Sequence, residues 1–429
     1  MIRDTFNRSL VRNTIWMLLG QGVRLVIQAL YFVEIARSLG ANNYGAFVGV
    51  VALVGIAFPF GALGSGNLLI KNVARDRTLF ATYWGRALAT TAVIGCVLLT
   101  GVLAVSRLAL PDSIPLVLVL LVAGSDLIGL NLINISAQAF QAFEQLNWTA
   151  TINALISAGR LAGAAVLVGL RPHPSALDWG YFYFLTTAAV AVTASLLVWK
   201  KLGAPRFAWP TSAAEMREGF YFSSSLSAQT IYNDIDKTML ARLGTLDAAG
   251  IYGAAYRLVD VAFVPIAALV YSAYPSFFRA GAKGISASFD YAKPLLLHSF
   301  GYSSCICAVL LASAGIVPHI LGAEYARTTD ALRWLAPLPV LRGFHYFFSD
   351  SLTGAGYQGL RTTIQALVAI FNVLVNLWII PAYSWRGAAW SSIASDCLLA
   401  CTTAAAVLIL ARRSRARFEQ VPAPTAAET

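Results

Sequence analysis

Long apolar stretches recur along the whole chain and constrain its fold more than any single motif. We identify about twelve segments of roughly 20–26 residues, each long enough to cross a hydrocarbon core of about 30 Å as a helix. Because unpaired backbone groups are unfavourable in lipid, these segments should be helices and not strands of an open sheet. The sequence predicts an all-α integral membrane protein. The segments lie at approximately 13–36, 44–67, 84–106, 114–138, 149–170, 179–200, 219–242, 249–275, 294–317, 329–352, 361–381 and 387–411.

The composition excludes a soluble enzyme and a nucleic-acid binder. Hydrophobic residues make up 58% of the chain and charged residues only 12%, about half the charged share of a soluble domain. The net charge of +11 is explained by topology, because Lys and Arg collect on one side when both termini are placed in the cytoplasm. Residues 1–12 lead into a full-length first span, so no cleavable signal peptide is expected. The five cysteines lie inside spans without a zinc or disulfide pattern, and no metal site is expected.

The two halves of the chain resemble each other. The string IARSLGANNYGAF (35–47) joins the first two spans, and LARLGTLDAAGIYGAA (240–255) joins the seventh and eighth. Likewise, TINALISAGRLAG (151–163) matches TIQALVAIFNVLV (363–375). Because each half holds an even number of spans, both halves enter the membrane in the same direction, as parallel repeats do.

This repeat predicts the domain organisation. We expect an N-lobe at 1–200 and a C-lobe at 219–411, with sites between the lobes. The linker 201–218 and the basic tail 412–429 would be cytoplasmic. Within the linker, the pattern from Ser212 to Glu215 is typical of a capping box and predicts a short interfacial helix.

Three arginines lie near the middle of predicted spans: Arg24, Arg160 and Arg342. None has an acidic residue three or four positions away on its own helix. A guanidinium at the bilayer centre costs about 2.5–3.5 kcal/mol even on the lenient insertion scales. Each arginine should therefore face a partner, a water-filled cavity or an anionic ligand. For Arg160, the sequence offers Asp126 or Asp396 as a partner from another span.

Polar side chains form stripes on three spans, because spacings of three or four residues place them on one helix face. These stripes either form hydrogen bonds between helices or line a ligand site, and the sequence leaves both interpretations open. The stripes are Gln21, Arg24, Gln28 and Tyr31 in the first span, Asn131, Asn134, Gln138 and Gln141 in the fourth, and Arg342, His345 and Ser349 in the tenth.

The seventh and eighth spans carry a charged cluster of Asp234, Asp236, Lys237, Arg257 and Asp260. Asp234 with Lys237, and Arg257 with Asp260, are spaced as i, i+3 ion pairs, which indicates a structural network. Alternatively, Asp236 or Asp234 takes up a coupling proton or sodium ion. On a helix, Asp234 and Asp236 point about 200° apart, so this D-x-D string does not predict a metal-dependent glycosyltransferase.

Four strings carry a resemblance to a known family: NTIWMLLGQGVR…ARSLGANNYG (13–45), NDIDKTMLARLG with GIYGAAYR (233–257), LTGAGYQGLRTTIQ (352–365) and WRGAAWSSIASD (385–396). In this order, the chain resembles the oligosaccharide flippase (Wzx-like) branch of the multidrug/oligosaccharidyl-lipid/polysaccharide (MOP) exporter superfamily. The resemblance implies a MATE-like fold, in which two six-helix lobes form a V around a cavity that opens alternately to each side.

The resemblance also implies a function. The protein would flip a polyprenyl-diphosphate-linked oligosaccharide across the bacterial inner membrane for O-antigen, capsule or exopolysaccharide synthesis. Membrane lipids would surround it, and a polysaccharide polymerase and a chain-length regulator would be partners, without nucleic acid. The residues expected to bind the diphosphate are Arg24 and Arg342, assisted by Arg160 or Lys237, and those expected to solvate the sugars are Gln21, Gln28, Asn131, Asn134 and Gln138.

No cofactor is expected, because the chain has no G-x-x-x-x-G-K-[ST] string for a nucleotide. Energy would come from a coupling ion, H⁺ or Na⁺, with Asp236, Asp234, Lys237, Arg257 and Asp260 as the candidate residues. Two alternatives remain open. The excess of unpaired arginines argues against an ion-coupled exporter of organic cations. The short predicted external loops argue against an enzyme such as a membrane-embedded polysaccharide polymerase or ligase.

Overall fold

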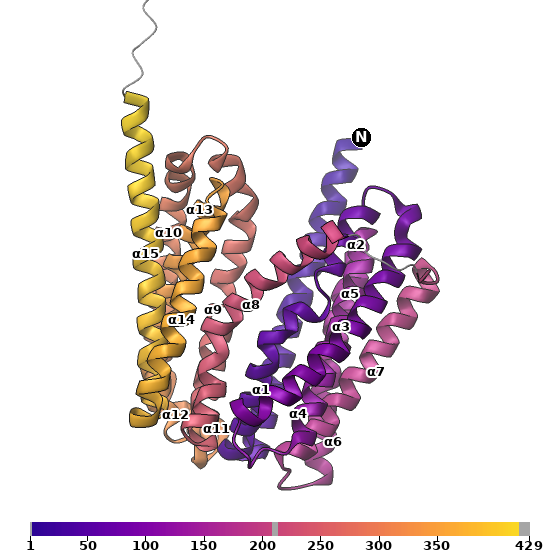
Figure 1. Cartoon of the computed structure of the whole chain (residues 1–429), viewed down its shortest axis with the longest axis vertical. Helices are drawn as coiled ribbons and strands as arrows, with labels where there is room; N and C mark the ends of the chain where they lie inside the picture. Colours follow the sequence, from indigo (N-terminus) through magenta and orange to yellow (C-terminus); the bar gives the residue numbers. More distant parts are fainter. Residues whose placement is uncertain (1, 208–212, 420–429) are drawn as a thin grey trace, which may run out of the picture. The chain divides into compact units, whose positions relative to one another are not determined.

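A computed structural model describes residues 2–207 and 213–419. Side chains are described from residue 25 to 414, apart from 208–215 and positions 218, 221, 222, 225 and 275. Over this part the chain is helical, without a strand (Figure 1). The prediction of an all-α membrane protein is therefore confirmed.

The helices follow one another with short connections. The first group is α1 (Ile2–Gly61), α2 (Ser65–Val73), α3 (Phe80–Ala109), α4 (Leu116–Ala123), α5 (Asn131–Ala142), α6 (Leu146–Leu170) and α7 (Ala176–Leu202). The second is α8 (Ala213–Leu243), α9 (Leu246–Gly281), α10 (Ile285–Ser313), α11 (Val317–Leu321), α12 (Thr328–Leu335), α13 (Leu338–Gly354), α14 (Gln358–Tyr383) and α15 (Trp385–Glu419). A π-helix, η2 (Gly124–Leu130), joins α4 to α5.

Nine helical stretches of the described residues are long and apolar enough to cross a membrane. The number of spanning helices differs from the twelve predicted spans for physical reasons. Helix α1 contains the first predicted span and most of the second, which ends in α2, and the two spans meet at a kink where Gly40 has φ 70° and ψ 169°. The predicted seventh and tenth spans correspond to α8 and to the α12–α13 pair, neither of which is among the nine. Helix α8 carries Asp234, Asp236 and Lys237, and the tenth span is broken near Pro337.

The chain divides into two compact units: Met1–Gly253 with Ile320–Tyr325, and Ala254–His319 with Ala326–Thr429. In the first unit, α1 packs against α6 and α8. In the second, α13 packs against α10 and α15, and α14 packs against α15 (Figure 1). The division falls inside α9, whereas the sequence places the lobe boundary in the linker. The six-plus-six lobe organisation stays a prediction.

The linker itself is only partly described. Helix α7 ends at Leu202 and α8 begins at Ala213. Ser212, which begins the predicted capping box, lies outside the described residues. The described part of the predicted interfacial helix forms the first turns of α8, which continues unbroken to Leu243.

The carboxyl end of α1 is held by side chains from other helices. The last carbonyls of a helix have no partner within it, and in lipid such groups must be satisfied by protein. Polar side chains of α5 and α8 donate to carbonyls in the last two turns of α1. The hydrogen bonds are Ser227 Oγ to the Ile56 carbonyl at 2.8 Å, Asn131 Nδ2 to the Phe58 carbonyl at 3.3 Å and Ser223 Oγ to the Pro59 carbonyl at 2.8 Å.

In the second unit, a buried polar ladder joins α14 to α15. Asn372 Nδ2 donates to Ser391 Oγ at 3.2 Å and to Ser395 Oγ at 3.0 Å. Asn376 Nδ2 donates to Asn372 Oδ1 at 3.0 Å. The two bonds from Asn372 cross from α14 to α15, and interhelical hydrogen bonds of this kind stabilise membrane proteins by about 0.6 kcal/mol each. The asparagines of the eleventh predicted span therefore serve helix packing.

The two similar motifs of the sequence, at 35–47 and 240–255, contact each other inside the first unit. Gly45 of the first motif lies so close to α9 that a Cβ there would be 1.8 Å from the Leu246 carbonyl oxygen. A Cβ at Gly250 of the second motif would be 1.9 Å from the Ala41 carbonyl oxygen. Only glycine permits this backbone approach. The repeat is thus also a packing interface between α1 and α9.

This contact predicts the effect of one methyl group. Gly45→Ala should lower the free energy of unfolding by about 1–3 kcal/mol, because overpacking forces the two backbones apart. Thermal unfolding of the detergent-solubilised protein measures this loss. The matched control is Gly101→Ala in α3, where no atom lies within 4 Å of the added Cβ. Equal unfolding midpoints for the two variants would contradict the packing role of Gly45.

Candidate functional site

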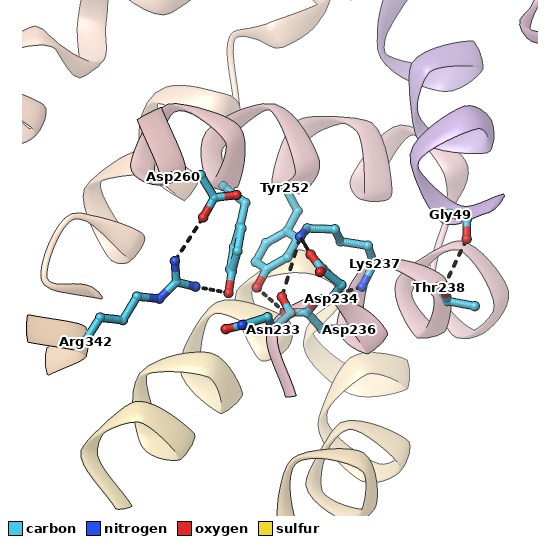
Figure 2. A network of polar contacts seen from close by, with 10 residues as sticks. Gly49, Asn233, Asp234, Asp236, Lys237, Thr238, Tyr252, Asp260 and Arg342 are labelled. Atoms are coloured by element: carbon cyan, nitrogen blue, oxygen red, sulfur yellow. Dashed lines mark hydrogen bonds and ion pairs between the residues drawn. The ribbon is translucent and has the colours of Figure 1, made fainter. Parts of the chain in front are cut away.

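Arg342 lies at the centre of a buried charged site in the second unit (Figure 2). It projects from α13, and its side chain is 7% exposed. Its Nη1 donates to Asp260 Oδ1 of α9 at 2.9 Å, and its Nη2 donates to the Tyr256 hydroxyl. Its Nε lies 3.6 Å from Asp396 Oδ2 of α15. Two carboxylates and a phenol thus surround one guanidinium, and helices α9, α13 and α15 are joined through it.

His345 and Ser349 extend this site along α13. His345 Nε2 lies 3.7 Å from Asp396 Oδ1, and both side chains are buried. The His345 ring stacks on Tyr346, with 4.4 Å between ring centroids. Within the described residues, the buried Ser349 hydroxyl has no hydrogen-bond partner. The stripe predicted in the tenth span is therefore buried in the second unit.

Arg160 forms a second charged site, in the first unit. Its Nη2 lies 3.4 Å from Asp126 Oδ1. Its guanidinium lies over the Tyr183 ring, 4.1 Å from the centroid, and the Tyr183 hydroxyl donates to Asp126 Oδ1 at 2.9 Å. Asp126 belongs to the π-helix η2, and single π-helical turns occur frequently at functional sites. Of the two partners that the sequence offers for Arg160, the structure selects Asp126.

These contacts change the interpretation of the spanning arginines. The absence of an acidic neighbour on the same helix does not leave Arg160 or Arg342 unpaired, because carboxylates on other helices neutralise both. The side chain of Arg24, and that of Gln21, lies outside the described part. The Arg160 site therefore pairs one cation with one carboxylate, the Arg342 site pairs one cation with two, and neither is simply cationic.

The charged cluster of α8 has a pairing of its own (Figure 2). Lys237 Nζ bonds Asp234, as the i, i+3 spacing predicts. Asp236 is fully buried, accepts from the Lys237 backbone N–H at 2.8 Å and accepts from the Tyr252 hydroxyl. Because Asp234 and Asp236 take different partners, the helical D-x-D string does not bring its carboxylates onto one ion.

One predicted pair does not form. Asp260, three residues after Arg257, binds Arg342 instead. Among the described residues, Arg257 has no ion pair. The reason is that the buried guanidinium of Arg342 on α13 attracts Asp260 into a site that joins three helices. The structure thereby brings together Asp260, predicted to couple an ion, and Arg342, predicted to bind substrate.

The amides of the predicted sugar site have two different environments. Asn131 is buried, and its Nδ2 also contacts the Leu127 carbonyl at 3.1 Å, so it serves helix packing. Gln28, Asn134 and Gln138 are partly exposed, and in the described part of the chain their side chains form no hydrogen bond. Asn134 and Gln138 are spaced i, i+4 on α5 and share a face. These three amides have unused hydrogen-bonding capacity within the described residues, and Gln138 Oε1 lies against Gly66 of α2.

Sequence reasoning missed a further buried pair, Asp350 with Arg361. Arg361 Nη1 of α14 lies 3.0 Å from Asp350 Oδ1 of α13, and it also donates to the Thr353 hydroxyl at 2.8 Å. The tyrosines Tyr183 and Tyr256 were missed as well. Acidic residues inside apolar spans are the signal that would have found Asp350, because such residues need a partner.

A family model described as "Polysaccharide biosynthesis protein" matches residues 10–280, well over half of the 429-residue chain. The chain belongs to this family. The family match supports the resemblance seen in the sequence, and the long apolar helices of the described residues indicate a multi-pass membrane protein. No curated protein sequence matches the chain.

Solved structures of MOP superfamily transporters share the fold. An inward-facing multidrug resistance MATE family transporter aligns with a TM-score of 0.74 at 15% identity, covering 94% of this chain and 99% of that one. The outward-facing conformation of a multidrug resistance MATE family transporter gives 0.63 at 15% identity, covering 94% and 96%. A MOP superfamily transporter from Pyrococcus furiosus, reported with a binding pocket of reverse polarity, gives 0.62 at 15% identity, covering 93% and 95%. At this identity, the likeness shows the MATE-like fold alone.

The Arg160–Asp126 contact predicts strong coupling between two substitutions. Asp126→Asn or Arg160→Gln alone should cost about 3–5 kcal/mol of stability, because each leaves a buried charge without its partner. The double variant should lose less than the sum of the single losses. Unfolding of the four proteins in detergent measures this cycle.

The control is Arg171→Gln, which breaks an ion pair with Asp178 whose arginine is 63% exposed. That change should cost about 0–1 kcal/mol. Additive losses at Arg160 and Asp126 would show that the two side chains do not stabilise each other.

Proposed function

We propose that this protein is a flippase that moves a polyprenyl-diphosphate-linked oligosaccharide across the bacterial inner membrane by alternating access of two lobes. The observation that carries the proposal is the match of residues 10–280 to a polysaccharide biosynthesis family, in a chain with an exporter fold. In this proposal both termini are cytoplasmic. The product would supply O-antigen, capsule or exopolysaccharide synthesis, with a polymerase and a chain-length regulator as partners, and the protein would catalyse no covalent step.

The Arg342 site supports a way to bind and release the diphosphate. A guanidinium presents its donors in a planar fork that suits phosphate as well as carboxylate. Asp260 is 38% exposed at its side chain, whereas Asp396 is 5% exposed. Displacement of Asp260 from Arg342 Nη1 would free this donor for a phosphate oxygen. The Asp260 carboxylate and the phosphate would then compete for the same guanidinium.

The unpaired amides support a sugar-binding role. Gln28, Asn134 and Gln138 are partly exposed in the first unit and have donors and acceptors free in the described part of the chain. A side-chain amide offers both two N–H donors and a carbonyl acceptor, which matches sugar hydroxyls that donate and accept. The oligosaccharide would contact these groups, and Arg24 would add a second cation.

A second candidate is an ion-coupled exporter of organic cations. Its support is the pairing of Arg160 and Arg342 with carboxylates, which reduces the excess of unpaired arginines that argued against a cationic substrate. The structures that share the fold include multidrug resistance transporters. The two candidates differ in the charge of the substrate and are separated by a transport assay.

The proposed function is tested in proteoliposomes that contain a polyprenyl-diphosphate-linked oligosaccharide. A membrane-impermeant glycosidase reports the fraction of sugar exposed with time, under a proton or a sodium gradient. We expect protein-dependent exposure, slowed about tenfold or more in Arg342→Gln, because a charge-assisted hydrogen bond contributes about 1.5–3 kcal/mol. Asn134→Ala combined with Gln138→Ala should also slow it.

Trp378→Ala is the control, because this side chain on α14 is 83% exposed and lies outside the proposed site. Its exposure rate should equal that of the unchanged protein. Exposure no faster than in protein-free vesicles, together with gradient-driven efflux of ethidium, would refute the flippase and support the cation exporter.

A further inference from the structure

A cavity of about 320 Å³ lies in the second unit between α12 and the first turns of α15. Its size falls at the lower end of small-molecule sites, about 300–1,000 Å³. It is separate in sequence from the Arg342 site and takes no part in the contacts described above. Its lining is Asp330, Arg333, Trp334, Arg386 and Trp390.

Two indoles form the apolar wall of this cavity. The rings of Trp334 and Trp390 lie edge to face, with 5.8 Å between centroids and 74° between planes. Tyr383 supports Trp390 at 5.1 Å. Trp334 is 46% exposed, so part of its ring is open to a ligand. The Trp390 Nε1–H is buried and has no acceptor among the described residues, although a buried indole N–H usually finds one.

The charged side chains of the cavity leave one cation without a carboxylate. Arg333 Nη1 lies 3.7 Å from Asp330 Oδ1. The guanidinium of Arg386 lies over the Trp385 ring, 5.4 Å from its centroid. In the described part of the chain, no carboxylate is within ion-pair distance of Arg386. The lining therefore carries a net positive charge and favours an anionic ligand.

The cavity lies at the end of α15 opposite the basic tail. Trp385 is the first residue of this helix, and Arg412 and Arg413 lie close to its carboxyl end. A helix of 35 residues is about 52 Å long, more than the thickness of a hydrocarbon core of about 30 Å. If the tail is cytoplasmic, as the distribution of basic residues predicts, the cavity opens on the outer side of the membrane.

We propose that this cavity is a binding subsite for an acidic pyranose, a sugar ring that bears a carboxylate. The C–H face of a pyranose is apolar and packs against the face of an indole, here Trp334. Arg386 would bind the carboxylate through its planar fork. The class of ligand follows from one apolar wall and one unpaired cation in a single cavity.

This inference rests on the proposed function, because a glycan reaches the outer face only if it is exported there. The subsite would hold an acidic sugar of the head group after translocation and would favour glycans that contain a uronic acid. A phospholipid head group is the competing occupant, since Trp and Arg also anchor proteins at the membrane interface. The single unpaired cation of the described lining, Arg386, matches the one negative charge of a uronate, and the Trp334 ring matches the apolar C–H face that a pyranose has and a glycerol phosphate lacks.

The test measures binding of sodium D-glucuronate and of methyl glucoside to the full-length protein in detergent, by saturation-transfer NMR. We expect glucuronate to bind more tightly than the neutral sugar. Arg386→Gln should weaken glucuronate binding about tenfold, because a hydrogen bond to a charged group contributes about 1.5–3 kcal/mol, and should leave methyl glucoside unaffected. Trp334→Ala should weaken both, and the exposed Trp378→Ala should weaken neither.

Equal binding of glucuronate by the unchanged, Arg386→Gln and Trp334→Ala proteins, or no binding at all, would overturn the subsite. Displacement of glucuronate by glycerol phosphate at lower concentration would assign the cavity to a lipid head group instead. If Trp334→Ala fails to fold, Arg386→Gln carries the test, because this arginine is exposed and makes no ion pair in the described structure. Sugar binding without flipping would refute only the flippase, and flipping without sugar binding would refute only the subsite.

Discussion

Every ionised group placed among apolar helices needs a partner, and the arrangement of this protein depends on that requirement. The partners of Arg160, Arg342 and Arg361 all come from other helices. Each pair therefore also specifies which helices are neighbours. A buried pair adds little net stability over apolar packing, but an unmatched partner is strongly unfavourable. The charges thus act mainly against wrong helix arrangements, while apolar burial and the close glycine contacts hold the correct one.

The sites also differ in how firmly their charges are held. Asp126 receives both a guanidinium and the Tyr183 hydroxyl, and Arg160 is stacked on the same tyrosine. This closed arrangement suits a permanent structural role. Arg342 is shared between Asp260 and Asp396, and one of these carboxylates is partly exposed. A guanidinium with two partners can lose one and remain neutralised, which is the property that a site of changing occupancy requires.

The apolar stretches of the sequence predicted the fold class and the position of nearly every span, because length and hydropathy are local properties. The family resemblance could also be predicted, from the order of the motifs. The pairing of Asp260 could not be predicted, because the i, i+3 rule considers one helix and the stronger partner, Arg342, lies on another helix. The roles of Asn131, Ser223 and Ser227 at the end of α1 were hidden for the same reason: they depend on where a different helix stops. The cavity between Trp334 and Trp390 joins residues more than fifty positions apart, and no local pattern indicates it.

The close contact of Gly45 with Gly250 bears on how the internal repeat persists. Each glycine faces the backbone of the other motif, so the two equivalent positions are packing partners as well as sequence relatives. A side chain at one glycine would collide with the backbone of the other motif, where there is no side chain that could become smaller to make room. This backbone contact therefore limits which residues can replace either glycine. The similarity of the two motifs reflects a present mechanical constraint and not ancestry alone.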